Sequence, residues 1–187
     1  MDLSGMRFPR RLEADYGRDV IRDALSARTL KLWSGADLDV PLIAMKDPLR
    51  KALQATALKG RLHCGFEGVL QKLDNEKAGI AHVRERSDLP HGERISRLIL
   101  LSNDAAERFY RHVEQLLQSH APRLLGCLLD TDGSVLGKLI TGKDRPVKLV
   151  MADHKDAVSE ILRAILGEGR NGAKPAAGGS GTGIGGP

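Results

Sequence analysis

The stretch from Ile95 to Ala164 constrains the fold of this chain most, because apolar runs and helical patterns alternate along it. An apolar run at 98–101 is followed by polar residues and a helical pattern, and the same order recurs after residue 124. Short continuous apolar runs are typical of strands that are buried on both faces of a sheet. The alternation predicts an α/β fold: a three-layer α/β/α sandwich around a small mixed sheet, preceded by a short helical N-terminal segment.

The boundaries of these elements are predicted from turn and capping residues. We expect strands at 97–102, 124–129 and 147–151, helices at 105–119 and 135–140, and a final helix ending near residue 166. Asn103 or Asp104 should cap the first helix, because such side chains accept hydrogen bonds from free backbone N–H groups. Asp153 or Asp156 should cap the last one in the same way.

Three more helices are predicted upstream, from apolar residues at three- and four-residue spacing. The first runs from Arg18 to about Leu32. The second begins with Asp47 as N-cap and Pro48 at its first position, and the third begins near Gly65. Turn-forming residues should end these helices: Ser34-Gly35, Gly60 and Asp74-Asn75.

The patterns divide the chain into a basic helical segment at 1–45, the α/β/α domain at 46–168 and a glycine-rich tail at 169–187. The tail lacks aromatic residues and is expected to be disordered. Its glycines match G-x-G-x-x-G only by accident, because no strand precedes them and no helix follows. The charged residues 84–94 contain Pro and Gly and are expected to form a loop.

Composition favours a polyanionic partner inside the cell. The net charge is +5 and the pI is about 9.4, which suits RNA, DNA or an anionic membrane, although many proteins are merely basic. Aromatic residues make up only 3%, which argues against a stacking platform for single strands. Cys64 and Cys127 form no C-x-x-C pair and no export signal precedes them, which predicts reduced thiols in the cytoplasm. No apolar run approaches the roughly 20 residues of a membrane span.

Neither catalysis nor metal binding is predicted. The six histidines show no zinc-ligand spacing, and no G-x-S-x-G elbow is present. Gly142-Lys143-Asp144 lacks the Ser/Thr and the upstream glycine of a phosphate-binding loop. We therefore expect no enzyme activity, no metal and no cofactor.

Four passages identify a known family: residues 58–67, 98–106, 135–138 and 142–147. They are, in order, a basic turn and glycine before a helix, a strand with an Asp-Ala helix start, a Leu-Gly pair, and a Gly-Lys entry to the last strand. Through them residues 49–166 resemble the ribosomal L-seven-Ae and eukaryotic large-subunit thirty-e superfamily of RNA-binding proteins. The small bacterial ribosome-associated members are the branch that this chain resembles.

The resemblance implies an RNA site around a glycine-led helix and the loop before the short helix. A glycine lets backbone N–H groups approach a phosphate at the helix N-terminus, and cations add contacts that do not read sequence. The loop would press against an extruded base. The implied RNA-binding residues are Lys59, Arg61, Gly65, Phe66, Glu67, Gln71, Lys72, Thr131, Asp132, Gly133 and Ser134.

The kink-turn signature of the family is altered in this chain. Kink-turn binders carry Gly-x-Asn-Glu-x-x-Lys, whereas here Glu67 stands in place of Asn, Gly68 of Glu and Gln71 of Lys. This predicts a looser or different RNA specificity. Interpretations without a role in binding remain open. Lys59 and Arg61 could be solvated charges, Gly65 a helix-entry glycine, Phe66 a core residue and Thr131–Ser134 an ordinary loop.

The N-terminal part carries a weaker resemblance to YlxR-type modules, which are fused ahead of this fold in some bacteria. Arg18–Val40 is similar to the later portion of such a module. Only Arg10-Arg11-Leu12 and Gly17-Arg18 are left of its front portion, so the segment is interpreted as a degenerate or truncated copy.

Together these observations predict a cytoplasmic, bacterial-type protein that binds structured RNA, ribosomal or otherwise of the translation apparatus. Ribosomal or other translation proteins are further expected partners, and a membrane is not. Two alternatives stay open. One is a protein–protein module that kept the fold but lost RNA binding; the other is a small α/β enzyme, which would need a cleft holding groups with strongly shifted pKa values.

Overall fold

The protein was analysed as a computed structural model, which describes residues 3–84 and 94–170. Its strands are β1 (Thr29–Lys31), β2 (Asp39–Ala44), β3 (Leu62–Cys64), β4 (Arg97–Leu101), β5 (Leu124–Asp130) and β6 (Leu149–Ala152). Its helices are α1 (Arg10–Tyr16), α2 (Arg18–Ser26), α3 (Asp47–Leu58), α4 (Phe66–Arg84), α5 (Glu107–Ser119), α6 (Gly133–Thr141) and α7 (Lys155–Arg170).

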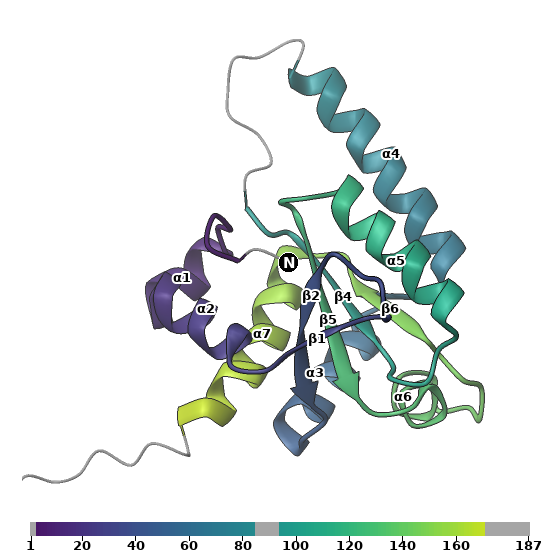
Figure 1. The fold of residues 1–187 in the computed structure, drawn as a ribbon. Helices are drawn as coiled ribbons and strands as arrows, with labels where there is room; N and C mark the ends of the chain where they lie inside the picture. The colour runs from purple at the N-terminus through teal and green to yellow at the C-terminus, as the bar shows by residue number, and fades with distance from the viewer. Residues whose placement is uncertain (1–2, 85–93, 171–187) are drawn as a thin grey trace, which may run out of the picture.

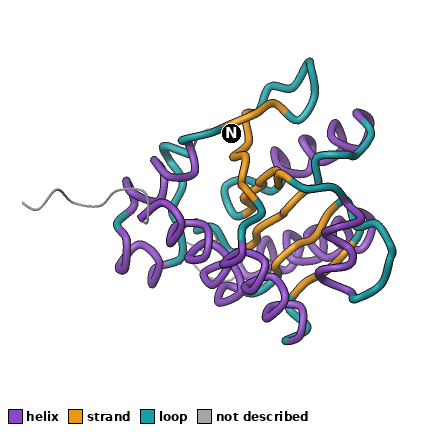
Figure 2. Tube along the Cα trace, turned by 90° about the horizontal axis from the view of Figure 1, so that it is seen from below, coloured by secondary structure: helices purple, strands orange, loops and turns teal. Residues whose placement is uncertain are grey.

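The strands form one mixed sheet in the order β1-β2-β5-β4-β6-β3. Strands β2, β5 and β4 are parallel, while β6 is antiparallel to β4 and β3 is antiparallel to β6. Helices cover both faces, with α1, α2 and α7 on one side and α4 and α5 on the other (Figure 1; Figure 2 shows the strands between them). The three-layer α/β/α fold predicted from the sequence is confirmed.

The central strands alternate between two hydrophobic cores. In β4, Leu98 and Leu100 point into the core beneath α1, α2, α3 and α7, whereas Ile99 and Leu101 point into the core beneath α4 and α5. All four side chains are at most 1% exposed. Successive residues of a strand face opposite sides, so a strand covered on both sides needs an unbroken apolar run. The apolar runs in the sequence are explained by these two cores.

Residues 3–45 pack into the same structure as the later described residues. Phe8, Leu12, Ile21 and Leu25 are fully buried in the core that Leu98 and Leu100 also enter. Strand β2 pairs in parallel with β5, and the division drawn at 45/46 falls directly after it. Both parts therefore contribute to one sheet and one core.

The predicted helix from Arg18 to Leu32 is wrong in its second half, because α2 ends at Ser26 and a strand follows. Ile21 and Leu25 lie in one core, but Leu32 lies in the other. A single helical stripe cannot reach both faces of a sheet, so the spacing of Leu32 was coincidental. Buried Glu114 of α5 holds the turn after β1 by accepting bonds from Trp33 Nε1 (2.6 Å) and the N–H of Leu38 (2.8 Å).

Helix α4 continues well beyond Asp74-Asn75, where an end was predicted. The second half is held by contacts to neighbouring elements: Glu76 pairs with Arg97 (2.7 Å) and Lys77 Nζ donates to the Ser119 carbonyl (3.2 Å). These tertiary contacts outweigh the low helix propensity of Asp and Asn. Most of the predicted 84–94 loop lies outside the described residues, as does 171–187 of the tail, while α7 extends to Arg170.

The capping predictions were also wrong in part. The N-cap of α5 is Ala106, which has no side-chain bond, and Asp47 is the first residue of α3 rather than its cap. Before α7, His154 Nδ1 accepts from the Asp156 N–H (3.2 Å), so the imidazole takes the role expected of a carboxylate. Asp104 and Asp153, which were expected to be caps, instead bind the Gly133 N–H and Lys72. None of the helices among residues 3–84 and 94–170 is long and apolar enough to cross a membrane.

Candidate nucleic-acid interface

Four helices begin at one edge of the sheet, which we call the carboxyl edge. Strands β2, β3, β4 and β5 run in the same direction, so their carboxyl ends lie together. They are followed by α3, α4, α5 and α6, and Figure 1 shows the arrowheads of β2 and β5 pointing toward α3 and α6. Helix N-termini carry free N–H groups and partial positive charge, and open α/β sheets bind ligands at this edge.

The loop Thr131–Ser134 is fixed by two carboxylates. Asp132 caps α6 by accepting bonds from the N–H groups of Ser134 and Val135, both at 2.8 Å. Asp104, once expected to cap α5, accepts from the Gly133 N–H at 2.9 Å. The first N–H groups of α6 are therefore occupied by the protein itself. The loop presents a rigid shape and exposed side chains, such as that of Ser134, rather than free backbone donors.

Asp104 is strongly stabilised in its ionised form. Desolvation would raise the pKa of this carboxyl group, but hydrogen bonds from Lys148 Nζ and from the Gly133 N–H lower it to about 2. Lys148 immediately precedes β6, so the ion pair joins the start of β6 to the turn after β4. The pair links two segments of the carboxyl edge, and each of its charges already has a partner.

The start of α4 combines a glycine at positive φ with a packed phenylalanine ring. Gly65 has φ +91°, which disfavours any other residue, and its N–H donates to the Leu149 carbonyl (3.0 Å). Phe66 is half-buried and meets the Phe109 ring edge-on at 5.9 Å between centroids. Glu67 and Gln71 are exposed on the first two turns of α4 and border a shallow groove. Phe66 therefore packs, whereas the other two side chains face solvent.

The cations of the predicted site lie at the opposite edge of the sheet, which we call the amino edge. Each is close to a carboxylate: Lys59 to Glu160 (2.9 Å), Arg61 to Asp156 (4.0 Å) and Lys72 to Asp153 (2.9 Å). Desolvation raises the pKa of Asp153, but bonds from Lys72 and His63 outweigh it and the pKa is lowered. The structure thus brings Gly65, Glu67 and the 131–134 loop to one edge, and the three cations to the other.

Sequence reasoning missed two cations at the carboxyl edge. Lys143 and Arg145 are exposed in the loop after α6, and no carboxylate among the described residues pairs with either side chain. This loop crosses α6 closely, since a Cβ atom on Gly137 would lie 1.8 Å from the Arg145 carbonyl oxygen. Burial raises the pKa of Cys64 at the end of β3, and the positive charge of Arg145 opposes this, which places Arg145 near the start of α4. The signal was the basic Gly-Lys-Asp-Arg loop itself, which sequence reasoning used only as a family marker.

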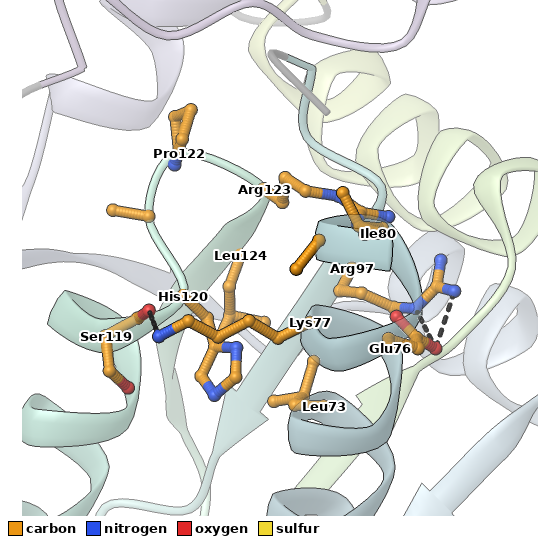
Figure 3. Close-up of a pocket in the computed structure, with 12 residues that line it drawn as sticks. Leu73, Glu76, Lys77, Ile80, Arg97, Ser119, His120, Pro122, Arg123 and Leu124 are labelled. Atoms are coloured by element: carbon orange, nitrogen blue, oxygen red, sulfur yellow. Dashed lines mark hydrogen bonds and ion pairs between the residues drawn. The ribbon is translucent and has the colours of Figure 1, made fainter. Parts of the chain in front are cut away.

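A separate pocket of about 300 Å³ lies between α4 and the turn before β5 (Figure 3). Leu73, Ile80 and Leu124 give it an apolar wall, and the Glu76–Arg97 pair lies at one end. His120 also lines it, and burial lowers the pKa of this imidazole. The groups with the largest pKa shifts, Asp104 and the buried Cys127 thiol at about 12, do not line this pocket. This pocket therefore brings His120 but neither of those two groups to its wall.

Metal ligation finds no support in the part of the chain that the structure describes, where no three His, Cys, Asp or Glu side chains are grouped to hold an ion.

The similarity of this chain to known proteins lies in structure rather than in sequence. No family model matches the sequence, and no curated protein does. Among solved structures, the Giardia lamblia 15.5kD RNA binding protein is similar, with a TM-score of 0.43 and 12% sequence identity. The match covers 66% of this chain and 86% of that chain.

Proposed function

We propose that this protein binds structured RNA through a carboxyl-edge surface made of Gly65, Glu67, Gln71, Ser134, Lys143 and Arg145. One observation carries the proposal: four helices start at this edge, beside two exposed cations that have no carboxylate partner among the described residues. Cations without partners attract phosphate, and their contacts release counterions from RNA. Because these contacts do not read bases, they position the RNA backbone.

The aromatic residues favour folded RNA over single strands as the ligand. Recognition of single strands depends on exposed rings on which bases stack. Here Phe66 packs against Phe109, Tyr110 is buried, and the Arg111 guanidinium covers Trp33 at 4.5 Å. Shape and backbone are then the features left to recognise, which is how proteins bind RNA helices. Glu67 and Gln71 offer polar groups to base edges beside the start of α4.

The finer proposal concerns the RNA itself. On the resemblance of four sequence passages, we propose ribosomal RNA or another RNA of the translation apparatus, with ribosomal or translation proteins nearby. Because Gly68 and Gln71 replace the Glu and Lys of the kink-turn signature, a kink-turn hairpin should bind less tightly than ribosomal RNA.

Replacing Lys143 and Arg145 with Ala tests the proposal. Affinity for ribosomal RNA should fall by about 10- to 100-fold near 0.1 M salt, because two phosphate contacts are lost. A control variant with Arg28→Ala and Lys77→Ala removes the same charge elsewhere and should bind nearly as the parent does. Equal affinity of the Lys143/Arg145 variant and the parent would exclude this surface. Lack of RNA binding by the parent at 50 mM salt would instead favour a protein partner.

A further inference from the structure

Two adjoining cavities lie between α1 and the first half of α7, on the layer opposite α4 and α5. Their volumes are about 660 and 360 Å³, and they share Arg11, Asp156 and Ser159 in their walls. We call the combined feature the α1–α7 groove. It lies near the amino edge, away from Lys143 and Arg145, because α7 begins where β6 ends.

The groove is rich in cations from four separate segments of the chain. Its basic residues are Arg10, Arg11, Lys59, Arg61, Arg94, Lys155 and Arg163. Among the described residues, two carboxylates line it, Asp156 and Glu160. Four of the cations are paired: Lys59 with Glu160, Arg61 with Asp156, Arg94 with Glu13, and Arg163 with Asp15. The lining residues therefore carry an excess of positive charge.

Three of these cations have no carboxylate partner in the described part of the chain: Arg10, Arg11 and Lys155. All three are exposed, and they lie along both walls of the larger cavity. Repulsion between like charges in one groove is unfavourable unless an anion joins them. The groove therefore presents a preformed arrangement of charge that lacks its counterpart.

The walls of the groove are held rigidly. Leu12 of α1 is fully buried, and Glu13 accepts from the Phe8 N–H (2.8 Å) and from Arg94 (2.5 Å). The Arg163–Asp15 pair (2.7 Å) joins α7 directly to α1. Cations on rigid elements lose less conformational freedom on binding than cations on mobile loops. This distinguishes the groove from scattered surface charge.

We propose that the α1–α7 groove binds the phosphodiester backbone of a second RNA segment. Arginine favours this ligand, because its planar guanidinium matches two phosphate oxygens at once. The identity of the polyanion as RNA rests on the proposed function, but the location of the groove does not. The carboxyl-edge surface lies at the other end of strands that are four to seven residues long. At 3.3 Å per residue the groove and that surface are roughly 13–23 Å apart. One protein molecule therefore contacts two segments of a folded RNA.

The test compares the Arg10→Ala/Arg11→Ala/Lys155→Ala variant with the parent in binding to ribosomal RNA across a salt series. Affinity should fall about tenfold or more near 0.1 M salt. The slope of log affinity against log salt should become shallower by about 2–3, since each lost phosphate contact accounts for about 0.9. The control variant Arg22→Ala/Arg28→Ala/Lys77→Ala removes the same residue types outside the groove and should keep most of the affinity and slope.

The folding of each variant is checked by thermal unfolding and by the fluorescence of Trp33, the single tryptophan. If the triple variant fails to fold, Arg10→Gln/Lys155→Gln replaces it and should still lower the slope by about 1–2. Parent-like affinity and slope in a folded variant would overturn the inference.

The outcomes also separate the two proposals. Loss of binding only in the Lys143/Arg145 variant would keep the carboxyl-edge surface and reject the groove. Loss only in the groove variant would do the reverse. If the parent binds tripolyphosphate by calorimetry, dependent on Arg10 and Arg11, but binds no RNA, then the ligand is a phosphorylated small molecule and the RNA assignment is wrong.

Discussion

The two edges of the sheet use their carboxylates differently. At the carboxyl edge, Asp104 and Asp132 accept bonds from backbone N–H groups, and Asp104 also binds the half-buried Lys148. The exposed cations Lys143 and Arg145 are left without partners among the described residues. At the amino edge, by contrast, Asp153, Asp156 and Glu160 each lie next to an exposed or half-buried cation.

The comparison indicates that a basic residue marks an anion site only where no nearby carboxylate already pairs with it. Ion pairs at the surface contribute about 0–1 kcal/mol, so a phosphate can displace a carboxylate such as Glu160 at small cost. The carboxyl-edge cations need no such exchange. We therefore expect Lys59 and Arg61 to add to RNA affinity only after their pairs open, unlike Lys143 and Arg145 at the carboxyl edge and the unpaired cations of the α1–α7 groove.

The largest predicted effect concerns the contact between α6 and the loop that follows it, at the carboxyl edge. Gly137→Ala should lower the free energy of unfolding by about 3 kcal/mol, because its Cβ would lie 1.8 Å from the backbone oxygen of Arg145. The loop that carries Lys143 and Arg145 would have to move. Urea unfolding followed by circular dichroism measures the loss.

Gly68→Ala supplies the matched control. Gly68 also lies in a helix, but a Cβ there meets no atom within 4 Å. Alanine should stabilise the protein by about 0.5–1 kcal/mol, since it restricts the unfolded chain and favours helix. If both variants lost the same stability, the close approach at Gly137 would not support the carboxyl edge.

The sequence was sufficient for the layers of this fold but not for the partners of its charges. Strands β4, β5 and β6 could be predicted because burial on both faces leaves continuous apolar runs, a local signal. Strand β1 could not, because Leu30 is exposed and Leu32 belongs to a different core from α2. The length of α4 depends on contacts with Arg97 and Ser119, which are distant in sequence.

The candidate site shows the same limit more sharply. Lys59 and its partner Glu160 are 101 positions apart, and His63 and Asp153 are 90 positions apart. No local pattern can show that such side chains pair with each other. Arg10 and Arg11 could be noted in the sequence, but their position beside Lys155 depends on α1 packing on α7.

A smaller effect is predicted for the pH dependence of stability at the carboxyl edge. The pKa of Asp104 is lowered from 3.8 to about 2 by folding, so its contribution is full above pH 4 and is lost as the pH falls toward 2. The side chain is 37% exposed, so solvent screening limits the contribution to about 1 kcal/mol. Asp104→Asn should therefore destabilise the protein at pH 6, and the difference should shrink to about a third of that near pH 2.5. Urea midpoints of both proteins at the two pH values measure this, and a constant difference would contradict it.

The smallest predicted effect tests whether ion pairing at the amino edge lowers the affinity for RNA. Glu160→Gln removes the partner of Lys59 and should strengthen RNA binding by about two- to fivefold, because one cation is freed and one repulsive charge is lost. Asp23→Asn is the control, since it also removes an exposed carboxylate beside an arginine, on α2, which does not line the groove. Fluorescence anisotropy with labelled ribosomal RNA near 0.1 M salt measures both variants. Equal gains would mean that net charge alone sets affinity; a gain restricted to Glu160→Gln would show that the amino edge is held back by its own carboxylates.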